Sequence, residues 1–341
     1  MQTSDFDYDY PDHLVATHPE ANFRTMCVEA GVAVPLEISK SELLNKFSHG
    51  DVLAINDTRV VRRRITTATG LEILFLNKLD SSNIWEVLFP ARSVKDFEEI
   101  PLPGGVTAKL IERGLPQKLS VSITLDENYF SEHAELALPP YIQKARGERH
   151  NLPDEDVWYQ TACAKNPGSQ AAPTASLHFT SQDIDFLKSR GVVIAPLTLH
   201  VGMGTFLPIK TETLEDHKMH FEWAHLPAES VAKITAAKAA GRRVWALGTT
   251  AVRTLESWAI GKLSASGDGD FAGQTDLFIR PGYRFEVVDG LLTNFHQPSS
   301  TLIALVSAFA GREQVLAAYK WAMAQNFRLF SYGDLTVWTR S

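Results

Sequence analysis

Histidines recur at the ends of expected structural elements in this sequence. In LTLHVGMGTFLP (Leu197–Pro208), an apolar strand pattern ends at His200, and the chain then breaks at Gly202 and Gly204. Further motifs carry His178, His217, His220 and His296. Because an imidazole takes up and releases a proton near neutral pH, these positions are candidates for general acid–base catalysis. For each histidine taken alone, a purely structural role is the alternative.

Two other uses of these motifs have weaker support. His217 and His220 have the i, i+3 spacing of a shared helical face, but no HExxH or CxxC pattern supplies further metal ligands. The loop VGMGTF lacks a dinucleotide fingerprint, because Leu207 stands at the third glycine position and no helix pattern follows. The sequence therefore favours a site without a metal ion or a dinucleotide, and a metal-dependent hydrolase is the weaker alternative.

The segment LGTTAVRTLES offers a site for an anionic group. A buried strand pattern runs into Gly248, after which Thr249 and Thr250 begin a helix. The first turn of a helix presents free backbone N–H groups, and the two hydroxyls add donors, so an anion can bind there. An ordinary helix N-cap is the alternative. Arg253 and Glu256 share a helix face one turn later and are expected to pair with each other.

A carboxylate also follows a buried strand pattern, in GDVLAIND (Gly50–Asp57). At that position Asp57 can act as a base, accept a hydrogen bond from a ribose hydroxyl, or pair with a cation. An Asx turn is the structural alternative for the same side chain.

Two kinds of structure must position these side chains. From about Ile65 to Leu138 short strands alternate with turns, including a hairpin of 71–76 with 84–89, which is typical of a small barrel or sandwich. From Ala172 onward helices and strands alternate, as in an α/β fold. Helices are expected over 180–191, 228–240, 249–260, 299–310 and 313–325, and strands over 192–200, 244–247 and 327–332. Residues 1–64 and 151–341 are therefore expected to form one discontinuous α/β domain, interrupted by a β-domain over 65–150.

Composition limits the class of protein. The chain has 341 residues, 44% of them hydrophobic, and no apolar run is long enough to span a membrane. Its two cysteines are too few for a disulfide framework, which favours a cytoplasmic location. A net charge of −7 argues against a broadly basic nucleic-acid-binding surface. One local exception is Arg59 with Arg62–Arg64, which forms either a solvated strand edge or a set of phosphate contacts.

Taken together, the motifs identify a family. In chain order they are FDYDYPDHLVA, GDVLAINDTRV, AAPTASLHFT, LTLHVGMGTFLP, HKMHFEW, GTTAVRTLES, TDLFIRPGYRF, VVDGLLTNFHQPSSTL and FSYGD. The chain resembles the S-adenosylmethionine:tRNA ribosyltransferase-isomerases of queuosine biosynthesis, nearly from end to end. The resemblance implies a discontinuous α/β sandwich domain with an inserted, small antiparallel β-barrel domain.

The resemblance also implies a reaction. Family members transfer the ribosyl part of S-adenosylmethionine to the aminomethyl group of a 7-deazaguanine at the anticodon wobble position of tRNA. The sugar is isomerised to an epoxycyclopentane-diol, and adenine and methionine leave. Because the sulfonium acidifies the neighbouring 5′ carbon, a base must remove a proton there, and a donor assists the departure of adenine. A carboxylate or an aromatic face would stabilise the sulfonium.

Site residues follow from the resemblance as expectations. The catalytic candidates are His178, His200, His296 and Asp57. Candidates for binding S-adenosylmethionine are Thr249, Thr250, Arg253, Asp276, Gly202 and Gly204, where the glycines leave room for a bulky ligand. Candidates for binding tRNA are Arg59, Tyr283 and His220. A monomer without a metal ion is expected.

Three departures from the family pattern fall near these motifs. Ser176 stands where a glycine is usual, Glu20 lies where an arginine is common, and Val61–Ile65 lacks the usual proline and adds charge. They leave open an RNA-binding paralogue of the family with altered or lost activity.

Overall fold

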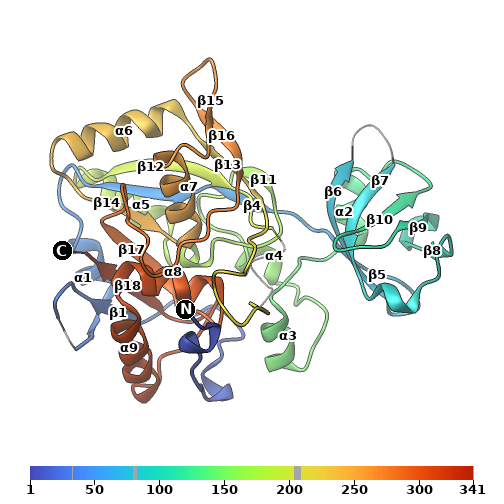
Figure 1. Ribbon diagram of the computed structural model, residues 1–341, viewed down its shortest axis with the longest axis horizontal. Helices are drawn as coiled ribbons and strands as arrows, with labels where there is room; N and C mark the ends of the chain where they lie inside the picture. Colours follow the sequence, from blue (N-terminus) through green and yellow to red (C-terminus); the bar gives the residue numbers. More distant parts are fainter. Residues whose placement is uncertain (33, 80–82, 203–208, 341) are drawn as a thin grey trace.

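The computed structural model describes residues 1–341 except 33, 80–82, 203–208 and 341, and it has two lobes (Figure 1). The larger lobe contains both termini and is built on a ten-stranded mixed sheet. The smaller lobe is built on a six-stranded antiparallel sheet. A short parallel pair, β4 (Thr58–Val60) with β11 (Asn166–Ser169), also belongs to the larger lobe.

Four parallel strands form the centre of the large sheet, in the order β12, β3, β14, β17. Their bounds are β3 (Val52–Asn56), β12 (Val193–Leu199), β14 (Val244–Leu247) and β17 (Gly290–Asn294). They are almost entirely buried, because helices cover both faces of the sheet, and this explains their continuous apolar sequences. The strands predicted for β3, β12 and β14 are confirmed.

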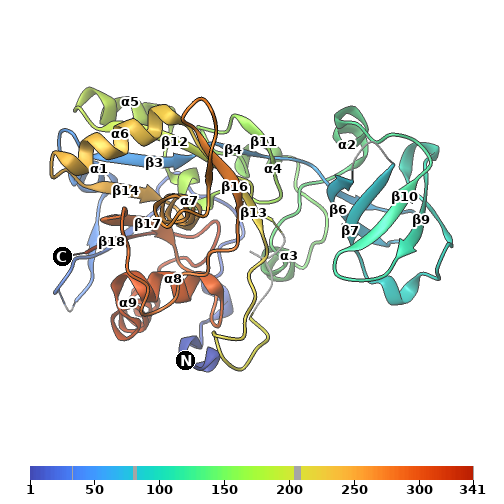
Figure 2. The ribbon, with the colours of Figure 1, turned by 45° about the horizontal axis from the view of Figure 1, so that its top comes forward.

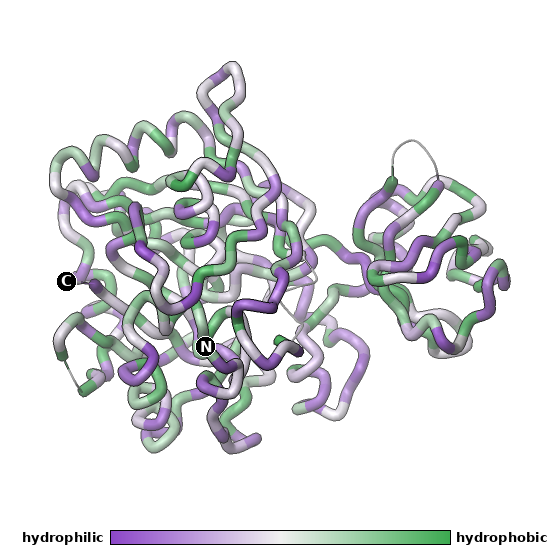
Figure 3. The backbone as a smooth tube through the Cα atoms, in the orientation of Figure 1, coloured by the Kyte–Doolittle hydropathy of each residue, from purple (hydrophilic) through white to green (hydrophobic). Residues whose placement is uncertain are grey.

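Alternate residues of β3 face the two helical layers on opposite sides of the sheet. Val52 and Ala54 belong to the core formed with α6–α9, whereas Leu53 and Ile55 belong to the core formed with α1 and α5. The bounds are α1 (Lys40–Asn45), α5 (Ser181–Ser189), α6 (Ala228–Ala239), α7 (Thr249–Ala259), α8 (Thr301–Ala310) and α9 (Arg312–Ala324). Figure 3 shows hydrophilic and hydrophobic residues alternating along α6, as expected for a helix with one face on a sheet.

The predicted helices are confirmed, including the capping box that Thr180 and Asp183 form at the start of α5. Among the described residues no single helix is long and apolar enough to span a membrane. The pair α8 and α9 would be so only together, and it is bent by 110°.

The remaining strands of the large sheet flank the parallel centre. On one side lie β18 (Leu335–Thr339), β1 (Thr25–Val28) and β2 (Leu36–Ile38), and on the other β13 (Glu222–Leu226), β16 (Phe271–Thr275) and β15 (Ser264–Ala265). Since β13 and β18 run antiparallel to the centre, their first residues meet the carboxyl ends of the central strands. One edge of the sheet thus collects residues from most of the motifs, and open α/β sheets bind ligands at this edge.

The smaller lobe confirms the predicted strand-rich segment. Its sheet order is β5-β6-β7-β10-β9-β8, all antiparallel, and β6 with β7 forms the expected hairpin. The bounds are β5 (Arg64–Thr66), β6 (Glu72–Leu79), β7 (Ile84–Leu88), β8 (Glu99–Pro101), β9 (Thr107–Glu112) and β10 (Gln117–Val121). Phe130 of α2 (Glu127–His133) packs against Phe75 and Trp85. Between its described edge strands, β5 and β8, the sheet does not close, so it is a curled half-barrel.

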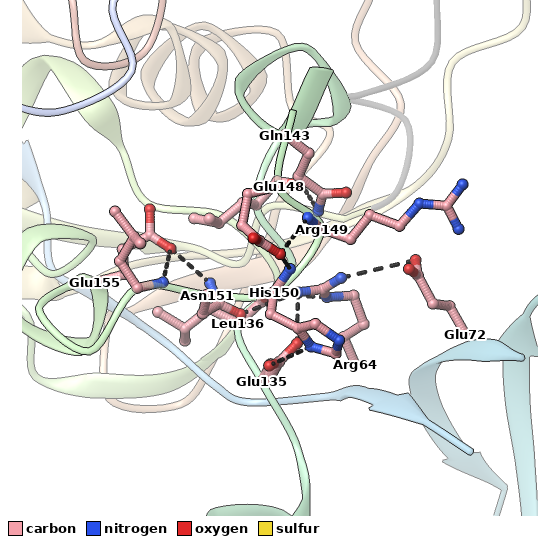
Figure 4. A network of polar contacts seen from close by, with 12 residues as sticks. Arg64, Glu72, Glu135, Leu136, Gln143, Glu148, Arg149, His150, Asn151 and Glu155 are labelled. Carbon is pink, nitrogen blue, oxygen red and sulfur yellow. Dashed lines mark hydrogen bonds and ion pairs between the residues drawn. The ribbon is translucent and has the colours of Figure 1, made fainter. Parts of the chain in front are cut away.

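Two segments connect the lobes, and a polar network joins them (Figure 4). The buried Arg64 lies at the start of β5. It donates to Glu135 (2.7 Å), to Asn151 (3.1 Å) and to the carbonyl of Leu136 (3.3 Å) in the returning segment. This segment also contains α3 (Pro140–Arg146) and α4 (Glu155–Trp158), with Arg146 paired to the buried Glu155 at 2.7 Å.

One predicted element, the closing strand, is wrong. No strand forms over 327–332; the last strand is β18, and a turn precedes it in which Phe330 has φ 71°. Asp334 fixes this turn by accepting the backbone N–H groups of Arg24 (2.9 Å) and Arg328 (2.7 Å). His217 and His220, whose spacing would suit a shared helix face, lie in an irregular segment before β13. The N–H of the buried Leu214 in this segment donates to the carbonyl of Met1 at 3.0 Å.

Candidate functional site

A cavity opens at the carboxyl edge of the sheet, and we call it the strand-end cavity. It lies between the start of α7, the end of β17 and the short 3₁₀ helix η5 (Thr174–His178). Its polar lining includes Thr174, Thr249, Thr250, Thr293, Asn294 and His296, and its aromatic lining includes Tyr141, Tyr159 and Phe330.

The start of α7 presents unpaired donors to the strand-end cavity. Gly248 is the N-cap, with φ 93°, and no side chain caps the helix. The first backbone N–H groups of a helix have no partner within it, and here they open beside the lining residues Thr249 and Thr250. The hydroxyl of Thr250 is buried and has no hydrogen-bond partner among the described residues. The helix start at Thr249 and Thr250 thus forms part of the cavity wall, and anion binding there stays a prediction.

His296 follows β17 and lines the strand-end cavity. Its Nε2 lies 3.0 Å from Thr293 Oγ1. Two tyrosine hydroxyls hold its backbone: Tyr8 donates to the carbonyl at 2.5 Å, and Tyr319 accepts from the N–H at 3.0 Å. Burial lowers the pKa of His296 to about 3. The expectation of a histidine that titrates near neutrality is thus wrong here, and His296 is a neutral hydrogen-bonding group.

His178 lies behind the strand-end cavity and does not line it. Asn294, a lining residue, donates from Nδ2 to His178 Nε2 at 3.2 Å, and the ring packs on Phe23 at 4.3 Å between centroids. Burial, with smaller effects from Lys40 and Arg328, lowers the pKa of His178 to about 3. In this structure His178 positions Asn294.

These two histidines predict a loss of stability on acidification. In the unfolded chain each has a pKa of about 6.5, so below that pH the unfolded state binds more protons than the folded state. Between pH 7.5 and 5.5 each is expected to lower the free energy of unfolding by about 1.4 kcal/mol. Urea unfolding at both pH values measures the change, and His296→Gln should remove about half of the part due to this pair. An unchanged pH dependence in that variant would contradict the assignment.

A second, smaller cavity is lined by Arg253, His217, His220, Glu222 and Leu302. Leu302 also lines the strand-end cavity. Arg253 Nη1 forms an ion pair with Glu222 Oε2, and both side chains are buried. The N–H of Gly202 donates to Glu222 Oε1 at 2.8 Å. Arg253 Nη2 is buried, and nothing in the part of the chain that the structure describes accepts from it.

The expected pairing of Arg253 with Glu256 is therefore wrong. Glu256 instead accepts the backbone N–H groups of Glu286, Val287 and Val288 at 2.9–3.1 Å. Glu222 was not predicted as a site residue. The signal for it was its position in HKMHFEW, a carboxylate between two aromatic residues in a strand pattern.

His200 and Asp57 do not line the strand-end cavity. They form a separate group at the same edge of the sheet, next to β4. His200 Nδ1 lies 2.8 Å from Thr58 Oγ1, and burial lowers the pKa of this histidine. Asp57 Oδ1 accepts from Thr198 (2.6 Å) and Asn166 (3.0 Å). Asp57 does not form the Asx turn; its neighbour Asn56 does, by accepting from the N–H of Thr58 at 3.2 Å.

The other predicted site residues are more scattered. Asp276 pairs with Lys262, which lowers the pKa of Asp276. The hydroxyl of Tyr283 donates to Glu256 at 3.2 Å, and burial raises the pKa of Tyr283. Gly204 lies outside the described residues.

Of the arginine-rich segment, only Arg59 is exposed and without a carboxylate partner among the described residues. Arg62 pairs with Asp156, Arg63 with Glu127, and Arg64 with Glu135. The first two pairs line a groove between the lobes, and the third lies next to it. Most of the positive charge of the segment is therefore neutralised within the protein.

Within the described residues, no group of three or more histidine, cysteine, aspartate or glutamate side chains is arranged to hold a metal ion.

Comparisons with known proteins cover almost the whole chain. The family model described as queuosine biosynthesis protein matches residues 3–337. The S-adenosylmethionine:tRNA ribosyltransferase-isomerase of Syntrophotalea carbinolica is 41% identical, with 98% of each chain covered. The crystal structure of the S-adenosylmethionine tRNA ribosyltransferase of Thermotoga maritima is similar with a TM-score of 0.56 and 30% identity, covering 98% of this chain and 100% of that one.

Proposed function

The chain belongs to the S-adenosylmethionine:tRNA ribosyltransferase-isomerase family, and from this premise we propose where and how its reaction takes place. The enzyme transfers the ribosyl part of S-adenosylmethionine to 7-aminomethyl-7-deazaguanine in tRNA and isomerises it. The products are epoxyqueuosine-tRNA, adenine and methionine.

The strand-end cavity is the proposed binding site of S-adenosylmethionine. The observation that carries this assignment is the start of α7, where unpaired backbone donors and the unpartnered Thr250 hydroxyl meet in a cavity lined by His296. These donors suit the methionine carboxylate. Arg253 and Glu222 line the adjoining smaller cavity. They neutralise each other, and Arg253 adds the buried donor Nη2.

The neutral state of His296 fits this chemistry. A protonated imidazole would repel the sulfonium, whereas a neutral ring donates a hydrogen bond from one nitrogen and accepts one at the other. We assign His296 to contact the reacting ribosyl part or the adenine that leaves. His200 and Asp57, outside the strand-end cavity, are assigned to the tRNA base, where the amine must lose a proton before it attacks.

The departures from the family pattern are compatible with activity. Ser176 is not among the described residues with positive φ, so the loss of a glycine there imposes no strain. Glu20 pairs with Arg328 at 3.2 Å, and Arg62–Arg64 pair with carboxylates between the lobes. None of these residues lines the strand-end cavity. This favours an active enzyme over a paralogue that only binds RNA.

The organisation of the molecule is part of the proposal. We assign residues 1–64 and 151–341 to a discontinuous catalytic α/β sandwich domain and 65–150 to an inserted domain, in which the curled half-barrel takes the place of the expected β-barrel. Because the substrate is tRNA, the cytoplasm is the proposed location, and a monomer is the proposed active form.

The activity is tested by incubating the protein with S-adenosylmethionine and tRNA that carries 7-aminomethyl-7-deazaguanine. Adenine release that requires this tRNA is the expected result. Binding of the tRNA without release of adenine would support the RNA-binding paralogue instead, and a metal-dependent activity would support a hydrolase. Thr250→Val should raise the KM for S-adenosylmethionine by about 10- to 150-fold, as for one lost hydrogen bond to a charged group.

A further inference from the structure

The outward face of β13 carries a row of exposed rings. Phe221, Trp223 and His225 alternate with the buried Glu222, Ala224 and Leu226. Phe221 is 63% exposed and Trp223 is 41% exposed. The solvent face of an antiparallel strand usually carries polar side chains, so two large exposed aromatic residues at adjacent outward positions call for an explanation.

The rings are ordered by stacking. Trp223 stacks with His200 at 5.2 Å and 20°, and with His225 at 5.8 Å and 22°. Thr58 holds His200, and Asp270 holds His225 at 2.9 Å. We call His200, Trp223, His225 and the neighbouring Phe221 the ring ladder.

The surroundings leave the ring ladder open. The neighbouring strand β16, which runs beside β13 in Figures 1 and 2, places Gln274 opposite Trp223 and the small Ala272 opposite His225. Beyond His200 lies Gly168, where an added Cβ would come within 2.8 Å of His200 Nε2. A glycine there allows the imidazole to lie against the backbone.

Spacing and charge indicate which ligand fits. Outward residues two positions apart on a strand are separated by about 6.8 Å, about twice the 3.4 Å spacing of stacked bases, so rings on this face are spaced on the scale of base stacking. Arg59 and Lys165 are exposed beside His200, and Lys218 precedes Phe221; among the described residues no carboxylate pairs with any of the three. Unpaired RNA bases with their phosphates require this combination of rings and cations.

We propose that the ring ladder is a stacking platform for the unpaired anticodon-loop bases that flank the base to be modified. This rests on the proposed function, since an enzyme that reacts at a wobble base must hold the neighbouring bases while that base enters the site. The platform begins at His200, beside Asp57, and so leads from solvent to the sheet edge. We therefore assign base stacking to the ring ladder in place of Tyr283, whose hydroxyl donates to Glu256.

Kinetics of Trp223 variants test the platform. Trp223→Ala is expected to raise the KM for tRNA by about 5- to 100-fold, the range for one lost base stack, with the KM for S-adenosylmethionine unchanged. Trp223→Phe should restore most of the affinity because it keeps a π-face. Phe186→Ala, which removes an exposed aromatic residue from α5, is the matched control and should behave like wild type.

Direct binding separates this proposal from the proposed function. Wild type should bind an anticodon stem-loop RNA more tightly than a fully paired RNA of equal length, and Trp223→Ala should lose that preference even if no turnover occurs. Three results would overturn the platform: a KM for tRNA within about twofold of wild type in Trp223→Ala, an unchanged preference for the stem-loop, or a change of molecular mass in this variant that marks β13 as a self-association surface.

Discussion

Replacing Arg253 with alanine is expected to lower the free energy of unfolding by about 3–5 kcal/mol. The change removes the guanidinium that pairs with the buried Glu222 carboxylate. It should also abolish turnover, because the pair adjoins the proposed S-adenosylmethionine site. Urea unfolding and the adenine-release assay measure the two effects.

A double variant separates charge balance from function. Arg253→Met with Glu222→Leu removes both charges at similar volume, so stability should return to within about 1–2 kcal/mol of wild type. Activity should stay lost, because neither the buried Arg253 donor nor the Glu222 carboxylate is present. Full activity in the double variant would show that the pair is only structural.

Replacing His296 with alanine is expected to lower kcat by about 10²- to 10⁴-fold, the range for a group that transfers or holds a proton in the transition state. The KM for tRNA should change little, because the ring ladder lies elsewhere. Since the ring is neutral in the folded protein, His296→Asn should keep part of the rate by offering a neutral donor and acceptor. Single-turnover release of adenine is the measurement.

The control for His296 is His13→Ala, which removes an exposed histidine from the large lobe and should leave kcat unchanged. His178→Ala should have a smaller effect than His296→Ala, because it acts through Asn294. Equal activity of His296→Ala and wild type would refute the assignment of the strand-end cavity.

Much of the fold could be predicted because local patterns and burial agree. The apolar runs at β3, β12 and β14 mark strands covered on both faces, and the Thr180 capping box marks the start of α5. The closing strand was misplaced because Phe327–Tyr332 is apolar for a different reason. Its residues pack in the core from a turn that Asp334 holds, a long-range constraint that periodicity does not reveal.

The site could be predicted only in part. Element ends located Thr249, Thr250 and His296 correctly at one edge, because the carboxyl ends of parallel strands meet there. Pairing partners could not be predicted: Arg253 bonds to Glu222, far away in sequence, and not to Glu256 on its own helix. The pKa values of His178 and His296 depend on burial, which becomes known only when the chain is folded.

This protein is expected to use the ribosyl part of S-adenosylmethionine and not its methyl group. The most direct measurement supplies S-adenosylmethionine labelled either in the ribose or in the methyl group, together with tRNA carrying 7-aminomethyl-7-deazaguanine, and follows the label. Ribose label should enter the tRNA with one adenine and one methionine released for each modified base, and methyl label should remain in methionine. Methyl label in the tRNA, or ribose label that stays out of it while adenine is released, would contradict this expectation.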